Sequence, residues 1–131
     1  MAQNYKNKSL SEILDLKKLE AVNKPIETAN GLPNECYINE DYLAYEKEKV
    51  FCDKWTVIGV ASSIPNPGDV KPYNLLGIPL ILIRDKKMKI RVFHNVCSHR
   101  GFKLLDKQCT LKNVLRCPYH SWSYDFNGNL V

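Results

Sequence analysis

Two short cysteine–histidine segments constrain this chain more than any other feature. The first reads C-S-H-R-G at residues 97–101, and the second reads C-P-Y-H-S-W at residues 117–122. Each places one thiol and one imidazole within a few residues, and the glycine of the first and the proline of the second are typical of sharp turns. Such turns let both side chains of a segment point at one object. The pattern therefore predicts two loops that share four metal ligands, Cys97, His99, Cys117 and His120.

Two thiols and two imidazoles suit a two-iron cluster. A 2Fe–2S cluster needs four terminal ligands, and the Rieske type replaces two of the four thiolates by histidines on one iron. Two ferric ions, two sulfides and two thiolates then sum to zero charge, whereas an all-thiolate cluster is negative and harder to reduce. We therefore expect a Rieske-type 2Fe–2S cofactor that passes single electrons. Because the imidazoles keep a dissociable N–H, its potential should depend on pH in alkaline solution.

Other interpretations of the four residues stay open at this point. Structural zinc also takes mixed cysteine and histidine ligands, although usually from C-x₂₋₄-C and H-x₃₋₅-H pairs. A zinc-binding structural module is therefore the alternative from a different functional class. Cys97 or Cys117 beside a histidine also resembles a catalytic nucleophile, and a chance group of buried side chains would bind nothing. Colour distinguishes the Rieske cluster from structural zinc, because a Rieske cluster is red-brown and zinc is colourless.

The pattern around the two segments changes from helical to extended along the chain. Helical spacing of apolar residues predicts helices over 9–22 and over 39–51, the second with Asn39 as its cap. Short apolar or alternating segments then predict strands over 55–61, 72–76, 79–84, 89–94, 114–117 and 122–126. Turn residues at 85–87 and at 127–128 separate strands. We expect a mostly β chain, a small antiparallel sandwich or barrel preceded by N-terminal helices.

Composition excludes several classes of partner. The 19 Lys and Arg residues exceed the 14 Asp and Glu residues by five, but they are scattered, so no nucleic acid is expected. No run approaches the ~20 apolar residues that cross a bilayer, so no membrane is expected. The N-terminus is polar and has no secretory signal, which favours a cytoplasmic location. Five cysteines in a reducing compartment then indicate metal or redox chemistry rather than disulfides.

The two segments resemble the cluster-binding loops of Rieske domains, and more of the chain is similar to the large (alpha) subunits of ring-hydroxylating oxygenases. The similar stretches are E-x₄-F-x₃-W at 46–55, P-G-D at 67–69, F-H-N-V at 93–96 and Y-D-F-N-G-N-L at 124–130. The resemblance implies a Rieske-type antiparallel β-sandwich with a small cluster-binding subdomain. It also implies that the two cysteines bind one iron and the two histidines the other. By this resemblance residues 1–52 form a helical or extended N-terminal segment and residues 53–131 the iron–sulfur domain, C-terminally truncated relative to the family.

Departures from the wider family indicate the subtype. Rieske proteins of respiratory and photosynthetic chains carry an extra cysteine in each loop, joined as a disulfide, where this chain has Phe102 and Tyr119. Trp122 replaces a hydroxyl residue that hydrogen-bonds a cluster sulfide in those proteins. Both changes imply an oxygenase-type cluster of lower potential. Tyr119 and Trp122 are expected to shield the cluster. Arg100 either tunes the cluster electrostatically or is an ordinary surface residue. Ser121 stands where the family usually has glycine. Similar loops with a small residue at this position occur in oxygenases that act on quaternary-ammonium compounds.

The histidine count bears on the rest of the family's chemistry. Oxygenases of this kind activate oxygen at a mononuclear iron held by two histidines and one carboxylate. The sequence has three histidines, and only His94 is left outside the loops. We therefore expect one-electron transfer without the catalytic domain, not a complete oxygenase. The expected partners are an electron-donating reductase or ferredoxin and an oxygenase catalytic domain, with homo-oligomer formation open. A stand-alone Rieske ferredoxin is the alternative, less favoured because some fifty residues precede the first predicted strand.

Overall fold

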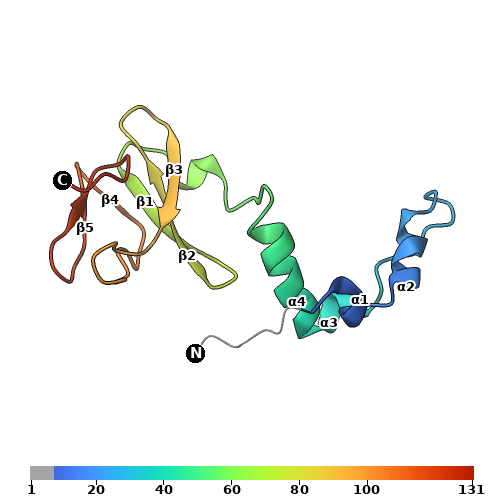
Figure 1. Cartoon of the computed structure of the whole chain (residues 1–131). Coiled ribbons are helices and arrows are strands. Elements are labelled where there is room, and N and C mark those ends of the chain that lie inside the picture. The colour runs from blue at the N-terminus through green and yellow to red at the C-terminus, as the bar shows by residue number, and fades with distance from the viewer. Residues whose placement is uncertain (1–7) are drawn as a thin grey trace. The chain divides into compact units, whose positions relative to one another are not determined.

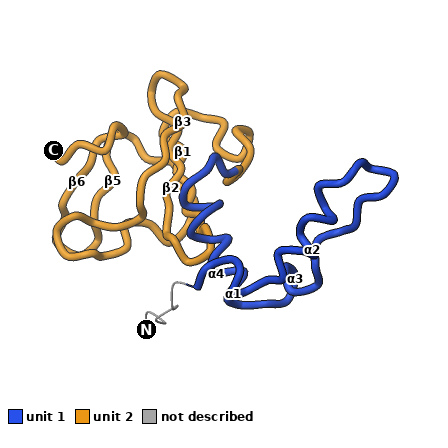
Figure 2. Tube along the Cα trace, turned by 45° about the vertical axis from the view of Figure 1, so that its right-hand side comes forward, with its two compact units in different colours: residues 1–56 blue, residues 57–131 orange. Residues whose placement is uncertain are grey.

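The computed structural model describes residues 8–131. The chain divides into two compact units after Thr56, shown in blue and orange in Figure 2. The first unit is helical, and the second holds every strand that the described residues form.

The helices of the first unit are short. They are α1 (Leu10–Ile13), α2 (Leu16–Glu20), the 3-10 turn η1 (Ala21–Asn23), α3 (Glu35–Ile38), α4 (Glu40–Glu46) and the π-helical turn η2 (Lys47–Phe51) (Figure 1). The single helix predicted over 9–22 is wrong, because Leu14 is extended at φ −130°. Asp15 then accepts a hydrogen bond from the Lys17 N–H at 3.0 Å and begins α2. An aspartate side chain favours this capping role over a helix interior.

The predicted helix over 39–51 is confirmed as the continuous pair α4 and η2. Asn39 caps it as expected, because its Oδ1 accepts from the backbone N–H of Asp41 at 2.8 Å and of Tyr42 at 3.1 Å. None of the helices in the described part of the chain is both long and apolar enough to cross a membrane.

The second unit is built on an antiparallel sheet of order β3-β2-β1-β4. Its strands are β1 (Asp69–Leu75), β2 (Ile78–Arg84), β3 (Ile90–His94) and β4 (Cys109–Thr110) (Figure 1). A separate ribbon pairs β5 (Leu115–Arg116) with β6 (Ser123–Tyr124), and the 3-10 turn η3 (Ala61–Ser63) precedes the sheet. The expected architecture, mostly antiparallel β with N-terminal helices, is confirmed.

The core of the second unit joins the sheet to the loops that carry the two cysteines. Strand β2 is central, and Ile81 lies opposite Pro72 of β1 and Phe93 of β3. The buried cluster consists of Val70, Ile81, Ile83, Cys97, Leu104, Leu115, Cys117 and Phe126. Both thiols are therefore held as members of a packed core, where small displacements of a side chain are costly.

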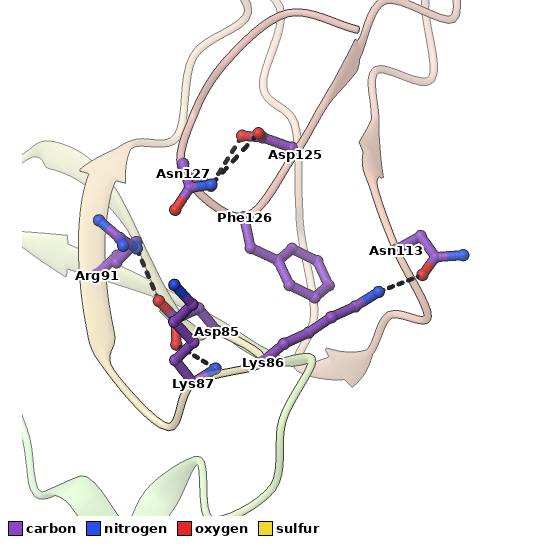
Figure 3. A pocket seen from close by; sticks show the side chains of 8 residues that line it. All are labelled: Asp85, Lys86, Lys87, Arg91, Asn113, Asp125, Phe126 and Asn127. Carbon is purple, nitrogen blue, oxygen red and sulfur yellow. Dashed lines mark hydrogen bonds and ion pairs between the residues drawn. The ribbon is translucent and has the colours of Figure 1, made fainter.

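An aspartate closes the turn between β2 and β3. The Asp85 carboxylate accepts from the backbone N–H of Lys87 and of Lys89, each at 2.8 Å. It also accepts from Arg91 Nε at 3.0 Å, as Figure 3 shows. Asp125 accepts the corresponding two backbone bonds in the turn that follows β6, at 2.8 and 2.9 Å. The turns predicted at 85–87 and 127–128 are thus confirmed, and the ion pair of Asp85 with Arg91 ties β3 to its own turn.

Two features of the sheet differ from the sequence prediction. The strand predicted over 55–61 is wrong, because no described strand pairs with this segment, and Trp55 and Val57 are 104% and 88% exposed. An alternating apolar pattern forms a strand only where a neighbour supplies ladder hydrogen bonds. Strand β4, by contrast, was not predicted from the sequence. It is a two-residue strand that forms because it pairs with Asp69 and Val70 of β1.

Candidate metal centre

The first cysteine–histidine segment folds into a tight loop that closes on itself. The Cys97 N–H donates to the carbonyl of Phe102 at 2.7 Å, and the Gly101 N–H donates back to the carbonyl of Cys97 at 2.9 Å. These two bonds fix the loop between its first and last residues. His99 at the centre of the loop is thereby held at a set direction from the thiol.

The second segment repeats the same backbone pattern. The Cys117 N–H donates to the carbonyl of Trp122 at 2.7 Å, and the Ser121 N–H donates to the carbonyl of Cys117 at 3.0 Å. Gly101 and Ser121 occupy equivalent places and share a left-handed backbone, at φ +68° and +61°. Glycine adopts this conformation without strain, whereas serine does not. The second loop therefore keeps its shape at a small conformational cost.

The two thiols lie deepest in the site. Cys97 is 1% exposed and Cys117 is 2% exposed. Burial acts to raise the pKa of the Cys97 thiol, but hydrogen bonds from the Tyr124 hydroxyl and the backbone N–H of His99, together with contact to the Cys117 side chain, outweigh it, so the pKa is lowered. A lowered pKa favours the thiolate, which is the form that binds metal.

Tyr124 on β6 supports the first loop. Its hydroxyl lies 3.2 Å from Cys97 Sγ and 2.9 Å from Ser98 Oγ, and it accepts from the Ser98 N–H at 3.2 Å. The sequence prediction named no role for this tyrosine. A signal was present, because Trp122 and Tyr124 are two residues apart on a predicted strand and so face the same side.

The two imidazoles lie next to each other at the outer side of the site. The rings of His99 and His120 have centroids 4.8 Å apart and cross at 73°. Burial lowers the pKa of His99, and the neighbouring His120 and Arg100 lower it further. A low pKa favours the neutral imidazole, which is the form that coordinates metal. His99 is half-buried and His120 is exposed.

Aromatic side chains cover the imidazoles. The His99 ring stacks on Trp122, with ring centroids 4.8 Å apart and ring planes at 11°. The centroids of the His120 and Tyr119 rings are 3.7 Å apart. Trp122 is half-buried and Tyr119 is 52% exposed. The side chain of Arg100 is exposed and forms no ion pair within residues 8–131, so it acts on the site through its charge, while the Arg100 backbone N–H adds to the lowering of the Cys97 pKa.

The arrangement brings two sulfur donors together in the core and two nitrogen donors together outside it. Among the described residues, no three His, Cys, Asp or Glu side chains group closely enough to hold one metal ion. His94 ends β3 with an exposed side chain, and Cys109 is an exposed free thiol on β4. The separated sulfur and nitrogen pairs fit the donor set of a two-iron cluster whose histidines are on one iron.

Comparison with known proteins identifies a matching family. The model of the Rieske [2Fe-2S] domain matches residues 54–131, which include both loops and every strand that residues 8–131 form. The oxygenase subunit of carnitine monooxygenase from Escherichia coli (strain K12) is 35% identical over 100 residues. The alpha subunit of benzene 1,2-dioxygenase from Pseudomonas putida is 34% identical over 105 residues.

Solved structures give the same result. The quaternary ammonium Rieske monooxygenase CntA in complex with L-carnitine superposes with a TM-score of 0.69 at 34% identity over 76% of this chain. Naphthalene 1,2-dioxygenase from Rhodococcus sp. superposes with a TM-score of 0.64 at 31% identity over 71% of this chain. The relatives thus include both a quaternary ammonium Rieske monooxygenase and naphthalene 1,2-dioxygenase.

The matched relatives are much longer than this chain. The match to the carnitine enzyme includes 76% of this chain but only 27% of that subunit. The match to the benzene enzyme includes 80% of this chain but only 23% of that subunit. In the two superposed structures it covers 28% and 21% of the longer chain.

Proposed function

This chain belongs to the Rieske [2Fe-2S] domain family, whose cofactor is a Rieske-type cluster, and we propose that its two loops hold that cluster and pass single electrons. The proposed ligands are Cys97, His99, Cys117 and His120. One observation carries the proposal. Two loops of identical hydrogen-bond pattern each contribute one thiol to the same core, and the rings of their two histidines lie 4.8 Å apart.

Each pair of ligands has its own task in this proposal. The cysteines anchor the cofactor in the core, and the histidines face outward, where an electron can cross to a partner. When bound, the cluster supplies a one-electron couple, which for Rieske centres lies between about −150 and +300 mV. Tyr124 places a hydroxyl against Cys97 Sγ and so stabilises the negative charge that reduction adds. Trp122 covers one face of the His99 ring, and Tyr119 lies against the ring of His120.

The wider role follows from the relatives, which are oxygenase subunits. We propose that residues 53–131 form the electron-transfer domain of such an oxygenase and that residues 1–52 are its N-terminal segment. The domain would receive electrons from a reductase or ferredoxin and pass them to a mononuclear iron site. That site needs two histidines, and His94 is the single one left among these 131 residues, so at least one ligand would come from elsewhere.

Self-association is part of the same proposal. A solved structure of the quaternary ammonium Rieske monooxygenase is described as revealing inter-subunit electron transfer. His120 is exposed, so an electron acceptor outside this domain can approach it. We therefore propose that the acceptor iron belongs to another copy in a homo-oligomer.

Cysteine variants test the ligand assignment. Cys97→Ala and Cys117→Ala should each abolish visible colour and bound iron, because either change removes a terminal ligand. Cys109→Ala is the matched control, since Cys109 is an exposed thiol of the same unit, and it should keep both. Retention of colour and iron in either of the first two variants would contradict the assignment.

A further inference from the structure

The two ligand loops are closed internally but are joined to each other only through side chains. Each loop's backbone hydrogen bonds run between its own first and last residues, and no backbone hydrogen bond in residues 8–131 connects 97–102 with 117–122. A site built from two separate loops opens if the loops move apart. Whatever connects their outer ends therefore sets how easily the site opens.

Aromatic rings make this connection, and they do so in a reciprocal way. The third residue of the first loop, His99, contacts the last residue of the second, Trp122. The third residue of the second loop, Tyr119, contacts the last residue of the first, Phe102, with ring centroids 5.3 Å apart and planes at 37°. The first contact, and a third between the rings of His99 and His120, involve proposed ligands, whereas the contact of Phe102 with Tyr119 involves none.

We propose that Phe102 and Tyr119 form a brace that holds the two loops together at their exposed side and slows loss of the cluster. This inference rests on the proposed function, because the brace acts on the site that the two loops form. Phe102 and Tyr119 are positioning residues: they contact each other and, through Tyr119, the His120 ring. Their centroid separation lies within the 4.5–7 Å range of favourable aromatic pairs.

The brace can be removed without removing the core. Phe102 is 44% exposed and Tyr119 is 52% exposed, and neither belongs to the buried cluster of the second unit. Trp122, by contrast, packs against that cluster, so its replacement would affect folding as well as the site. The Phe102–Tyr119 contact is therefore the one link whose effect on loop opening can be measured separately from stability.

A double-mutant cycle tests the brace. The rate constant of cluster loss is followed by the decay of visible absorbance in excess chelator for wild type, Phe102→Leu, Tyr119→Leu and the double variant. Loss of the interaction energy of one aromatic pair of this kind should raise the rate constant of cluster loss about two- to tenfold. Each single variant should lose the cluster faster, and the double variant should be no faster than the faster single one, because the shared contact is lost only once.

Two controls separate the brace from general effects. Tyr119→Phe keeps the ring that contacts Phe102 and His120 and should therefore retain the wild-type rate. Tyr37→Leu changes a tyrosine that is 70% exposed on α3 and should also leave the rate unchanged. Strictly multiplicative effects of Phe102→Leu and Tyr119→Leu would overturn the proposal, since they would show that the two rings act independently.

Amide exchange gives a second readout that needs no cofactor. The N–H groups of Gly101 and Ser121 close the two loops and report their opening directly. Loss of either ring should accelerate exchange at both amides, including the amide in the loop that was not changed. Acceleration confined to the mutated loop would overturn the brace. A wild-type protein without iron would instead refute the proposed function, while the amide measurement would still decide the brace.

Discussion

Removal of one hydroxyl at Tyr124 should lower the reduction potential while leaving the cluster in place. The Ser98 N–H donates to Tyr124 Oη, and Ser98 Oγ, 2.9 Å away, can donate as well. The single proton of the tyrosine is then left for Cys97 Sγ at 3.2 Å. Tyr124→Phe deletes that donor and keeps the ring that packs against the core.

The magnitude follows from the strength of such a bond. A hydrogen bond to a charged acceptor contributes about 1.5–3 kcal/mol. Only the part that grows on reduction changes the potential, and we take it as about 1 kcal/mol. For a one-electron couple, 59 mV corresponds to a tenfold change in equilibrium constant, so 1 kcal/mol corresponds to about 40 mV. The expected result is a potential lower by about 40 mV.

Voltammetry on the loaded protein measures this shift. Tyr119→Phe is the matched control, because it also removes one tyrosine hydroxyl but keeps the ring that contacts Phe102 and His120, and it should leave the potential unchanged. An unchanged potential in Tyr124→Phe would refute the reasoning. A rise in potential would refute it as well, since a lost donor cannot favour the more negative state.

Three further predictions concern stability. Ser121→Gly should raise the free energy of unfolding by about 0.5–1 kcal/mol in denaturant titration, because it relieves a φ of +61°; a loss of stability would contradict this. Asn95→Leu should lower it by about 2–4 kcal/mol, because the 1% exposed Asn95 accepts from the backbone N–H of Leu104 and of Leu105; a cost below about 1 kcal/mol would show that water replaces those bonds. Burial acts to raise the pKa of Asp85, but backbone N–H donors and Arg91 outweigh it and lower the pKa. The stability from Asp85 is therefore full above about pH 5 and is lost as the pH falls through its unfolded pKa near 4 toward the lower folded value. Asp85→Asn should therefore reduce the decrease in the free energy of unfolding between about pH 5 and the lower folded pKa. Asp106→Asn, which changes a side chain that is 78% exposed, should leave that decrease unchanged.

The sequence predicted the parts of this molecule that depend on local pattern. Alternation and turn residues placed β1, β2 and β3 to within a few residues, and Asn39 was expected to cap the helix that it caps. The spacing in the two loops selected two thiols that the fold buries in one core and two imidazoles that it places side by side. Glycine and serine at equivalent left-handed positions explain why both loops turn so sharply.

Features that depend on distant partners were not predictable in this way. The segment around Trp55 has the composition of a strand but lacks a neighbour to pair with, whereas β4 is a strand because Asp69 and Val70 offer a free edge. Tyr124 reaches Cys97 across 27 positions of sequence. The contact of Phe102 with Tyr119 likewise becomes visible only once the two loops are placed side by side.

Metal analysis of the purified chain tests the central claim most directly. The account predicts two irons and two acid-labile sulfides per chain, a red-brown colour, and a rhombic paramagnetic signal with a low average g after one-electron reduction. A colourless protein that holds one zinc per chain and gives no such signal would contradict it.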